Sequence, residues 1–140
     1  MSIDFTALQP LGWSNAFSTQ LSLDQMENSR AALVTAVERG SFLVDAGSGP
    51  FGATLAGRFR HSHSTPEELP TVGDWVLLDS ESPLIVDRLE RQNLIARRMA
   101  GGIETQPIAA NIDLMVIVSG LDAEFNLHRI ERYLVIAAQS

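Results

Sequence analysis

The sequence has 140 residues, 45% of them hydrophobic, with ten basic against seventeen acidic residues and a net charge of −7. This composition is typical of one globular domain or slightly more, long enough to bury a core. The absence of cysteine excludes disulfides, thiolate metal sites and a cysteine nucleophile within these residues. There is no basic, apolar leader, and the longest apolar run, Leu114–Val118, is too short to cross a bilayer. We therefore expect a cytoplasmic protein with no membrane partner.

The net charge argues against a nucleic-acid partner, because phosphate binding depends on Lys and Arg. The charges are unevenly spread, however: residues 29–63 and 91–112 are mildly basic, and residues 64–90 are strongly acidic. All ten basic residues are arginine, which suits bidentate phosphate contacts but is also explained by a GC-rich genome. Composition leaves RNA binding open.

Residues 1–30 are expected to form an N-terminal arm of short helical turns, because their apolar residues follow no long period. Residues 31–92 then read as a small closed barrel, with turns rich in glycine, proline and serine between the strands. The five expected strands are Ala32–Glu38, Ser41–Asp45, Phe51–Arg60, Val72–Ser80 and Pro83–Leu89. Periodicity alone does not choose between an OB barrel, an SH3-like barrel and a sandwich.

Residues 93–112 read as a polar, glycine-punctuated linker. The continuous apolar run Leu114–Val118 predicts a strand buried on both faces of a parallel sheet. An amphipathic helix should follow, with Asn126 as its N-cap. One strand and one helix cannot cover such a strand, so we expect residues 113–140 to be the first βα unit of a truncated second domain, with uncovered apolar surface.

Short motifs occur in order along the chain. They are Arg39-Gly40, Gly57-Arg58, Pro-Thr-Val-Gly-Asp-Trp-Val at 70–76, Gln-Pro-Ile-Ala-Ala-Asn-Ile-Asp at 106–113, Asp-Ala-Glu-Phe-Asn at 122–126 and Glu-Arg-Tyr-Leu at 131–134. Together they resemble the ribosome small-subunit-dependent GTPase A family from about residue 30 to the end. The resemblance implies a mainly β fold, a five-stranded OB-fold barrel followed by the start of a circularly permuted α/β GTPase domain.

The resemblance also implies that the parent protein hydrolyses GTP on the small ribosomal subunit late in its maturation, with the barrel on ribosomal RNA. GTP, magnesium and zinc are implied for that parent. This chain has no lysine, so it contains neither a Gly-x-x-x-x-Gly-Lys-Ser/Thr phosphate loop nor an Asn-Lys-x-Asp guanine motif. We therefore assign it no catalytic, nucleotide-binding or metal residue and no cofactor. In the alternative hypothesis the barrel mainly docks against the GTPase domain of the same parent chain and has little RNA affinity.

The candidate RNA-binding residues are Arg39, Arg58, Arg60, His61 and His63. Arg58 and Arg60 alternate at the end of the expected third strand, so both should share a face and clamp successive phosphates, unless they are only solvated edge residues. Arg39 lies in the first hairpin, a loop that OB folds use for oligonucleotides, although arginine is also an ordinary turn residue. His61 and His63 have the spacing of a metal half-site but too few partners for zinc, which favours contact with phosphate or solvent.

Three further side chains have two interpretations each. Trp75 is expected to be buried in the barrel rather than to stack on a base. Arg97 and Arg98 either contact RNA or pair with the acidic segment 64–90.

Overall fold

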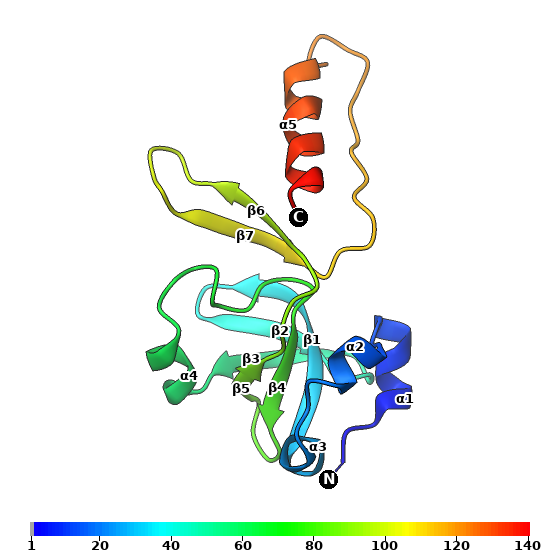
Figure 1. The fold of residues 1–140 in the computed structure, drawn as a ribbon, viewed down its shortest axis with the longest axis vertical. Coiled ribbons are helices and arrows are strands. Elements are labelled where there is room, and N and C mark those ends of the chain that lie inside the picture. The colour runs from blue at the N-terminus through cyan, green and yellow to red at the C-terminus, as the bar shows by residue number, and fades with distance from the viewer. Residues whose placement is uncertain (1) are drawn as a thin grey trace.

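The computed structural model describes residues 2–140, so of the predicted arm only Met1 lies outside it. Five strands form one sheet: β1 (Ser29–Glu38), β2 (Ser41–Asp45), β3 (Pro50–Leu55), β4 (Trp75–Asp79) and β5 (Leu84–Arg88). Helices are few and short except at the C-terminal end (Figure 1). The prediction of a mainly β fold around a five-stranded sheet is confirmed.

The sheet closes on itself. Its strand order is β1-β2-β3-β5-β4, and β4 pairs back onto β1, with Ala31 opposite Leu77. All pairings are antiparallel except the short one between β3 and β5, where Thr54 lies opposite Leu84. We call β1–β5 the closed sheet.

The closed sheet is covered on both faces along β4, which explains why Trp75, Val76, Leu77 and Leu78 are all buried. Successive side chains of a strand point to opposite faces. One set packs inside the sheet: Ala32, Val34, Phe42, Val44, Ala53, Val76, Leu78 and Ile85. The other set, Ala31, Trp75, Leu77 and Leu89, packs outside the sheet against residues of the N-terminal arm: Ile3, Leu8, Trp13, Phe17 and Leu21.

The N-terminal arm consists of short helical turns, as its sequence indicated. These are α1 (Phe5–Leu8), the 3₁₀ turn η1 (Gln9–Leu11), α2 (Asn15–Ser18) and α3 (Leu23–Asn28). The edge of the Trp13 ring meets Trp75 at 4.8 Å between ring centroids, and the Trp13 indole N–H donates to Ser18 Oγ. Trp75 is therefore a core residue, as predicted, and offers no face to a base.

The expected third strand is too long. β3 ends at Leu55, and residues 57–62 form the short helix α4 (Gly57–Ser62). Only Phe59 of this helix is buried, and the preceding Ala56 provides no side-chain cap. The prediction that Arg58 and Arg60 share one face of a strand is therefore wrong, because residues two apart on a helix point in different directions.

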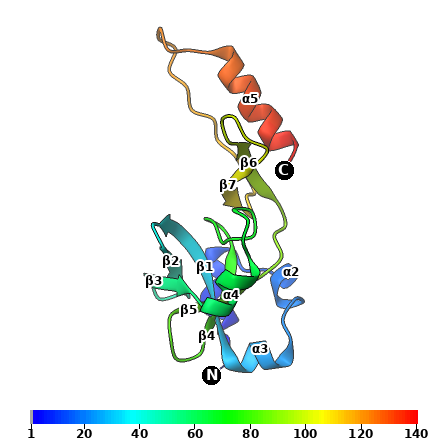
Figure 2. The same cartoon turned by 90° about the vertical axis from the view of Figure 1, so that its left-hand side faces the viewer.

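The expected linker, 93–112, is largely an antiparallel hairpin of β6 (Leu94–Arg98) and β7 (Thr105–Ala110). It stands between the closed sheet and the C-terminal helix in both views (Figures 1 and 2). Gly101 adopts a positive φ of 81° in the connecting turn, a conformation that favours glycine.

Residues 114–118 form no strand, contrary to the prediction; they are extended, with no paired neighbour among the described residues. Leu114, Val116 and Val118 are 79%, 72% and 88% exposed, so the expected uncovered apolar surface is present.

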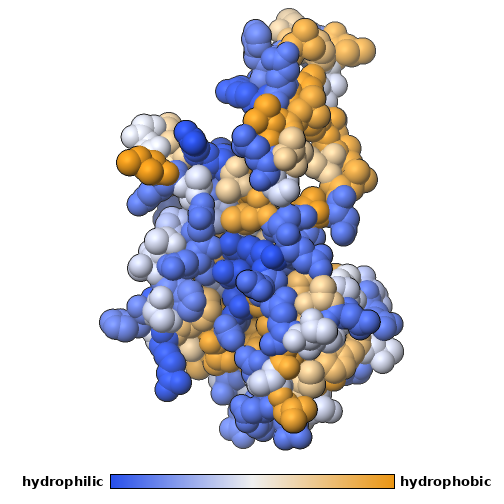
Figure 3. Space-filling model, viewed as in Figure 1, coloured by the Kyte–Doolittle hydropathy of each residue, from blue (hydrophilic) through white to orange (hydrophobic). Residues whose placement is uncertain are grey.

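Helix α5 (Leu127–Ala138) follows, and Asn126 caps it as predicted by accepting from the Arg129 N–H. Apolar residues gather over this upper part of the molecule (Figure 3). Within residues 2–140 no helix is long and apolar enough to span a membrane.

Candidate nucleic-acid interface

A groove of about 800 Å³ lies where four segments meet: the β1–β2 turn, the end of α4, the loop before β4, and β7. Its walls carry apolar side chains from β1, β2, β3, the loop before β4, and β7, among them Val37, Phe42, Leu55, Leu69, Val72 and Ile108. Polar groups at the groove include Glu38, Arg60, His63 and Gln106. An apolar cleft with a few polar groups is the usual form of a ligand site.

Two of the five predicted residues, Arg60 and His63, line this groove. Arg39 does not line it, but is exposed and is the chain neighbour of Gly40, which does. Arg58 and His61 are exposed on α4 and do not line the groove. None of this tests their role in RNA binding, which stays a prediction.

His63 is held in place by its own helix. Its ring stacks on the buried Phe59 ring at 4.0 Å between centroids and 14° between planes. Its Nδ1 lies 3.0 Å from the Phe59 carbonyl oxygen. Ser62 Oγ lies 2.9 Å from the same nitrogen. The imidazole therefore has a fixed orientation at the wall of the groove.

The loop after His63 is ordered by an acidic side chain. Glu68 accepts hydrogen bonds from the backbone N–H groups of Ser64 and Thr65, at 2.9 and 3.0 Å. These bonds, Thr65 first, keep the pKa of Glu68 below its ordinary value, and His63 contributes in the same direction. The carboxylate thus holds the loop in shape through backbone hydrogen bonds.

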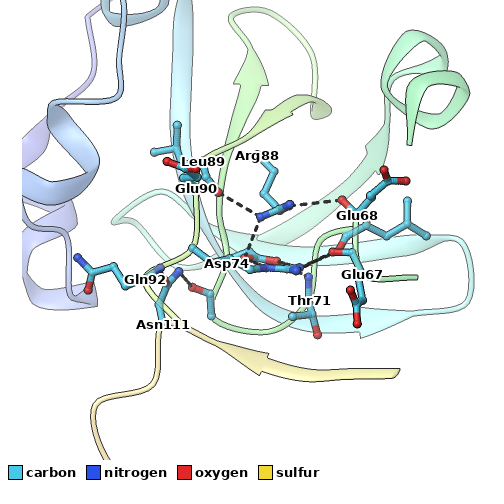
Figure 4. Close-up of polar contacts among 12 residues, drawn as sticks. Glu67, Glu68, Thr71, Asp74, Arg88, Leu89, Glu90, Gln92 and Asn111 are labelled. Carbon is cyan, nitrogen blue, oxygen red and sulfur yellow. Dashed lines mark hydrogen bonds and ion pairs between the residues drawn. The ribbon is translucent and has the colours of Figure 1, made fainter. Parts of the chain in front are cut away.

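A buried ion pair between Asp74 and Arg91 also holds the loop that precedes β4. Asp74 is fully buried, and Arg91 donates to both of its oxygens, at 2.8 Å from Nε and 2.7 Å from Nη2. The Thr71 N–H donates to Asp74 at 2.7 Å, while Arg88 is a more distant partner at 3.8 Å. Figure 4 shows Asp74 at the centre of these contacts.

Arg91 links the ion pair to the groove. Its guanidinium also donates to the carbonyl oxygens of Glu67 and Leu69, at 2.6 and 2.9 Å. Burial, reinforced by the neighbouring positive charge of Arg91, lowers the pKa of Arg88. Arg91 therefore joins the start of β4, the groove loop and the segment that leads to the hairpin. Sequence reasoning missed this pair, because 17 residues separate its members and neither has a distinctive local pattern.

A second contact holds the hairpin on the closed sheet. Asn111 has a positive φ of 54°, and its amide accepts from the Gln92 N–H and donates to the Gly73 carbonyl, at 2.8 and 2.9 Å. The Ala110 N–H donates to the Val72 carbonyl at 2.8 Å. These bonds place β7 against the groove.

Arg97 and Arg98 lie exposed on β6. Arg97 donates twice to Gln106 across the hairpin, so it does not pair with the acidic segment 64–90. Among residues 2–140 no group of three or more His, Asp or Glu side chains is placed to hold a metal ion.

Comparison with known proteins identifies relatives over nearly the whole chain. The RsgA GTPase family model matches residues 88–140. The small ribosomal subunit biogenesis GTPase RsgA 2 of Vibrio vulnificus is 40% identical over 134 residues, covering 95% of this chain and 36% of the relative. RsgA of Opitutus terrae is 36% identical, and RsgA 1 of Listeria innocua 38% identical, each over 95% of this chain and 40% and 37% of the relative.

This chain thus spans somewhat more than a third of the length of the relatives that it matches. The resemblance inferred from the motifs is confirmed: over the residues matched, this chain is similar to the RsgA GTPases.

Proposed function

We propose that this chain is the RNA-binding module of a GTPase that acts in the maturation of the small ribosomal subunit. The relatives are named for small-subunit biogenesis, which supports the process and the partner. The observation that carries the binding role is that Arg60 and His63 line one groove, with the exposed Arg39 next to the lining residue Gly40. Arginine suits this role because its planar guanidinium contacts phosphate through two hydrogen bonds.

We infer that the closed sheet is an OB-type barrel. The order β1-β2-β3-β5-β4 and the placing of α4 between β3 and β4 support this. OB folds bind oligonucleotides through the loop between their first two strands, which here carries Arg39. In this proposal residues 113–140 begin the GTPase domain, a role supported by the family match to residues 88–140.

The proposal gives this chain no part in GTP chemistry. It has no lysine for a phosphate loop or a guanine-reading motif. GTP, magnesium and zinc, which the family resemblance implies, would have to be held by residues other than those of this chain. The function derived for these residues is binding and positioning on the subunit.

A second function, docking against the GTPase domain of the same parent, is favoured by a different surface. Ile95 and Ile108 of the hairpin line an apolar cleft with Met115, Ile117 and Ile136. The outer sides of the 114–118 segment and of α5 are exposed and apolar. A patch of this kind is typical of a protein interface.

Binding to purified subunits distinguishes the two functions. We expect the chain to co-sediment with small ribosomal subunits at low salt and less at high salt, because phosphate contacts are salt-dependent. We also expect it to bind small subunits more tightly than large ones, because its relatives are named for biogenesis of the small subunit. A chain that binds neither subunit nor naked ribosomal RNA at low salt would contradict the RNA-binding function and favour docking.

A further inference from the structure

We propose that the groove takes an unpaired RNA nucleotide, with its base stacked on the imidazole of His63 and its phosphate on Arg60. This rests on the proposed RNA-binding function and names the form of RNA that the same site takes. The alternative forms, a duplex or a bare phosphate backbone, would use the arginines alone.

The first support is the preformed ring. One face of His63 packs on Phe59, and its Nδ1 is fixed by the Phe59 carbonyl, so the ring is already oriented before any ligand arrives. His63 is only partly exposed and lines the groove. Aromatic faces bind bases that have left the stack, and a base placed here would extend the Phe59–His63 pair.

The second support is the chemistry of the walls. Val37, Phe42, Leu55, Val72 and Ile108 line the groove. Apolar walls suit the flat face of a base, whereas the hydrated, charged backbone of a duplex would be desolvated there at a cost. A paired base cannot present its face, so the groove selects a nucleotide that is unpaired.

The third support is charge. Arg60 lines the groove three residues before His63, and the exposed Arg39 is the chain neighbour of the lining residue Gly40. Within the described residues the only carboxylate among the groove-lining side chains is that of Glu38. The positive charge of Arg60 suits a phosphate next to a base held on His63.

The helix provides its own controls. Arg58 and His61 are the same residue types as Arg60 and the C-cap residue His63, lie on the same helix as Arg60, and do not line the groove. Replacing either pair changes the charge of the chain equally. A difference between the pairs therefore reports position rather than net charge.

The experiment measures binding of this chain to three fluorescent probes at one low salt concentration: an oligoadenylate octamer, an abasic octamer with the same number of phosphates, and a short RNA duplex. We expect His63→Ala to weaken oligoadenylate binding roughly tenfold, the scale of one lost stack, and to leave the abasic probe within about twofold. Arg60→Ala should weaken both single-stranded probes. For Arg58→Ala and His61→Ala, the affinity for each probe should stay within about twofold of that of the unsubstituted chain.

The variant His63→Phe keeps an aromatic ring at position 63, where it can still pack on Phe59. If stacking carries the affinity, this variant should retain oligoadenylate binding. Equal affinity for the oligoadenylate and abasic probes, or equal losses in His63→Ala and His61→Ala, would overturn the nucleotide site while leaving RNA binding intact. A chain that binds none of the probes and no small subunits would overturn both proposals.

Discussion

Removing the buried carboxylate of Asp74 should destabilise the chain strongly. Asp74 accepts three hydrogen bonds of 2.7–2.8 Å, one from the Thr71 N–H and two from Arg91, and it is fully buried. Breaking a buried pair by removing one partner costs about 3–5 kcal/mol. In Asp74→Ala, Arg91 keeps its bonds to two carbonyl oxygens. We therefore expect the lower end, about 3 kcal/mol, out of a total stability of roughly 5–15 kcal/mol.

A double-mutant cycle isolates the pair from general damage at a buried site. Because Asp74→Ala and Arg91→Ala each leave the other group unpaired, the double variant should be less destabilised than the sum of the single ones, by about 1–3 kcal/mol. The matching cycle with Arg88→Ala should give less than about 1 kcal/mol, because Arg88 is 3.8 Å away and its side chain is 18% exposed.

Urea unfolding followed by tryptophan fluorescence measures these energies, since both Trp13 and Trp75 are buried in the core and become exposed on unfolding. Additive losses for Asp74 and Arg91, or equal coupling in the two cycles, would refute the assignment of Arg91 as the principal partner.

Two further predictions use local geometry. Gly73 and Gly40 both have positive φ, at 90° and 77°, but a Cβ on Gly73 would overlap the Ala110 carbonyl, whereas Gly40 has open space. Gly40→Ala should cost about 1–2 kcal/mol in urea unfolding and Gly73→Ala distinctly more; equal losses would show that β7 does not pack there. Hydrogen bonds, first from the Ser82 hydroxyl, lower the pKa of Asp79. Its stabilising contribution is thus present above the unfolded pKa and is lost as the pH falls through the folded one. NMR titration of Ser82→Ala should show the Asp79 pKa rising toward its ordinary value, and an unchanged pKa would disprove that cause.

The closed sheet was predictable because its signals are local. Apolar segments separated by glycine, proline and serine turns marked the strands, and β2 lies where the sequence placed it, at Ser41–Asp45. The error at Arg58 and Arg60 has a local cause too. The alternation Arg-Phe-Arg imitates a strand, and a six-residue helix without a side-chain cap leaves almost no signal of its own.

The remaining features depend on contacts between distant residues. The sequence predicts a linker where the hairpin β6–β7 lies, because the two strands are short, β7 contains Pro107, and the turn between them contains two glycines. The apolar run 114–118 predicted a strand, but a strand needs a neighbour to pair with, and none of the described residues supplies one. The groove could not be predicted because the β1–β2 turn, α4 and β7 meet there only through the closure of the sheet and the Asp74–Arg91 contact.

The central claim, that the groove face binds the RNA of the small ribosomal subunit, is tested most directly by the salt dependence of subunit binding in two charge-matched double variants. Arg39→Ala with Arg60→Ala removes one cation that lines the groove and one next to the lining residue Gly40, and Arg129→Ala with Arg132→Ala removes two from α5. Each lost phosphate contact should reduce the slope of log affinity against log salt by about one unit. For the Arg39/Arg60 variant we predict a slope reduced by about two units and weaker binding to the subunit. For the Arg129/Arg132 variant we predict a slope and an affinity close to those of the unsubstituted chain. An unchanged slope for the Arg39/Arg60 variant, or an equal reduction in both variants, would contradict the claim.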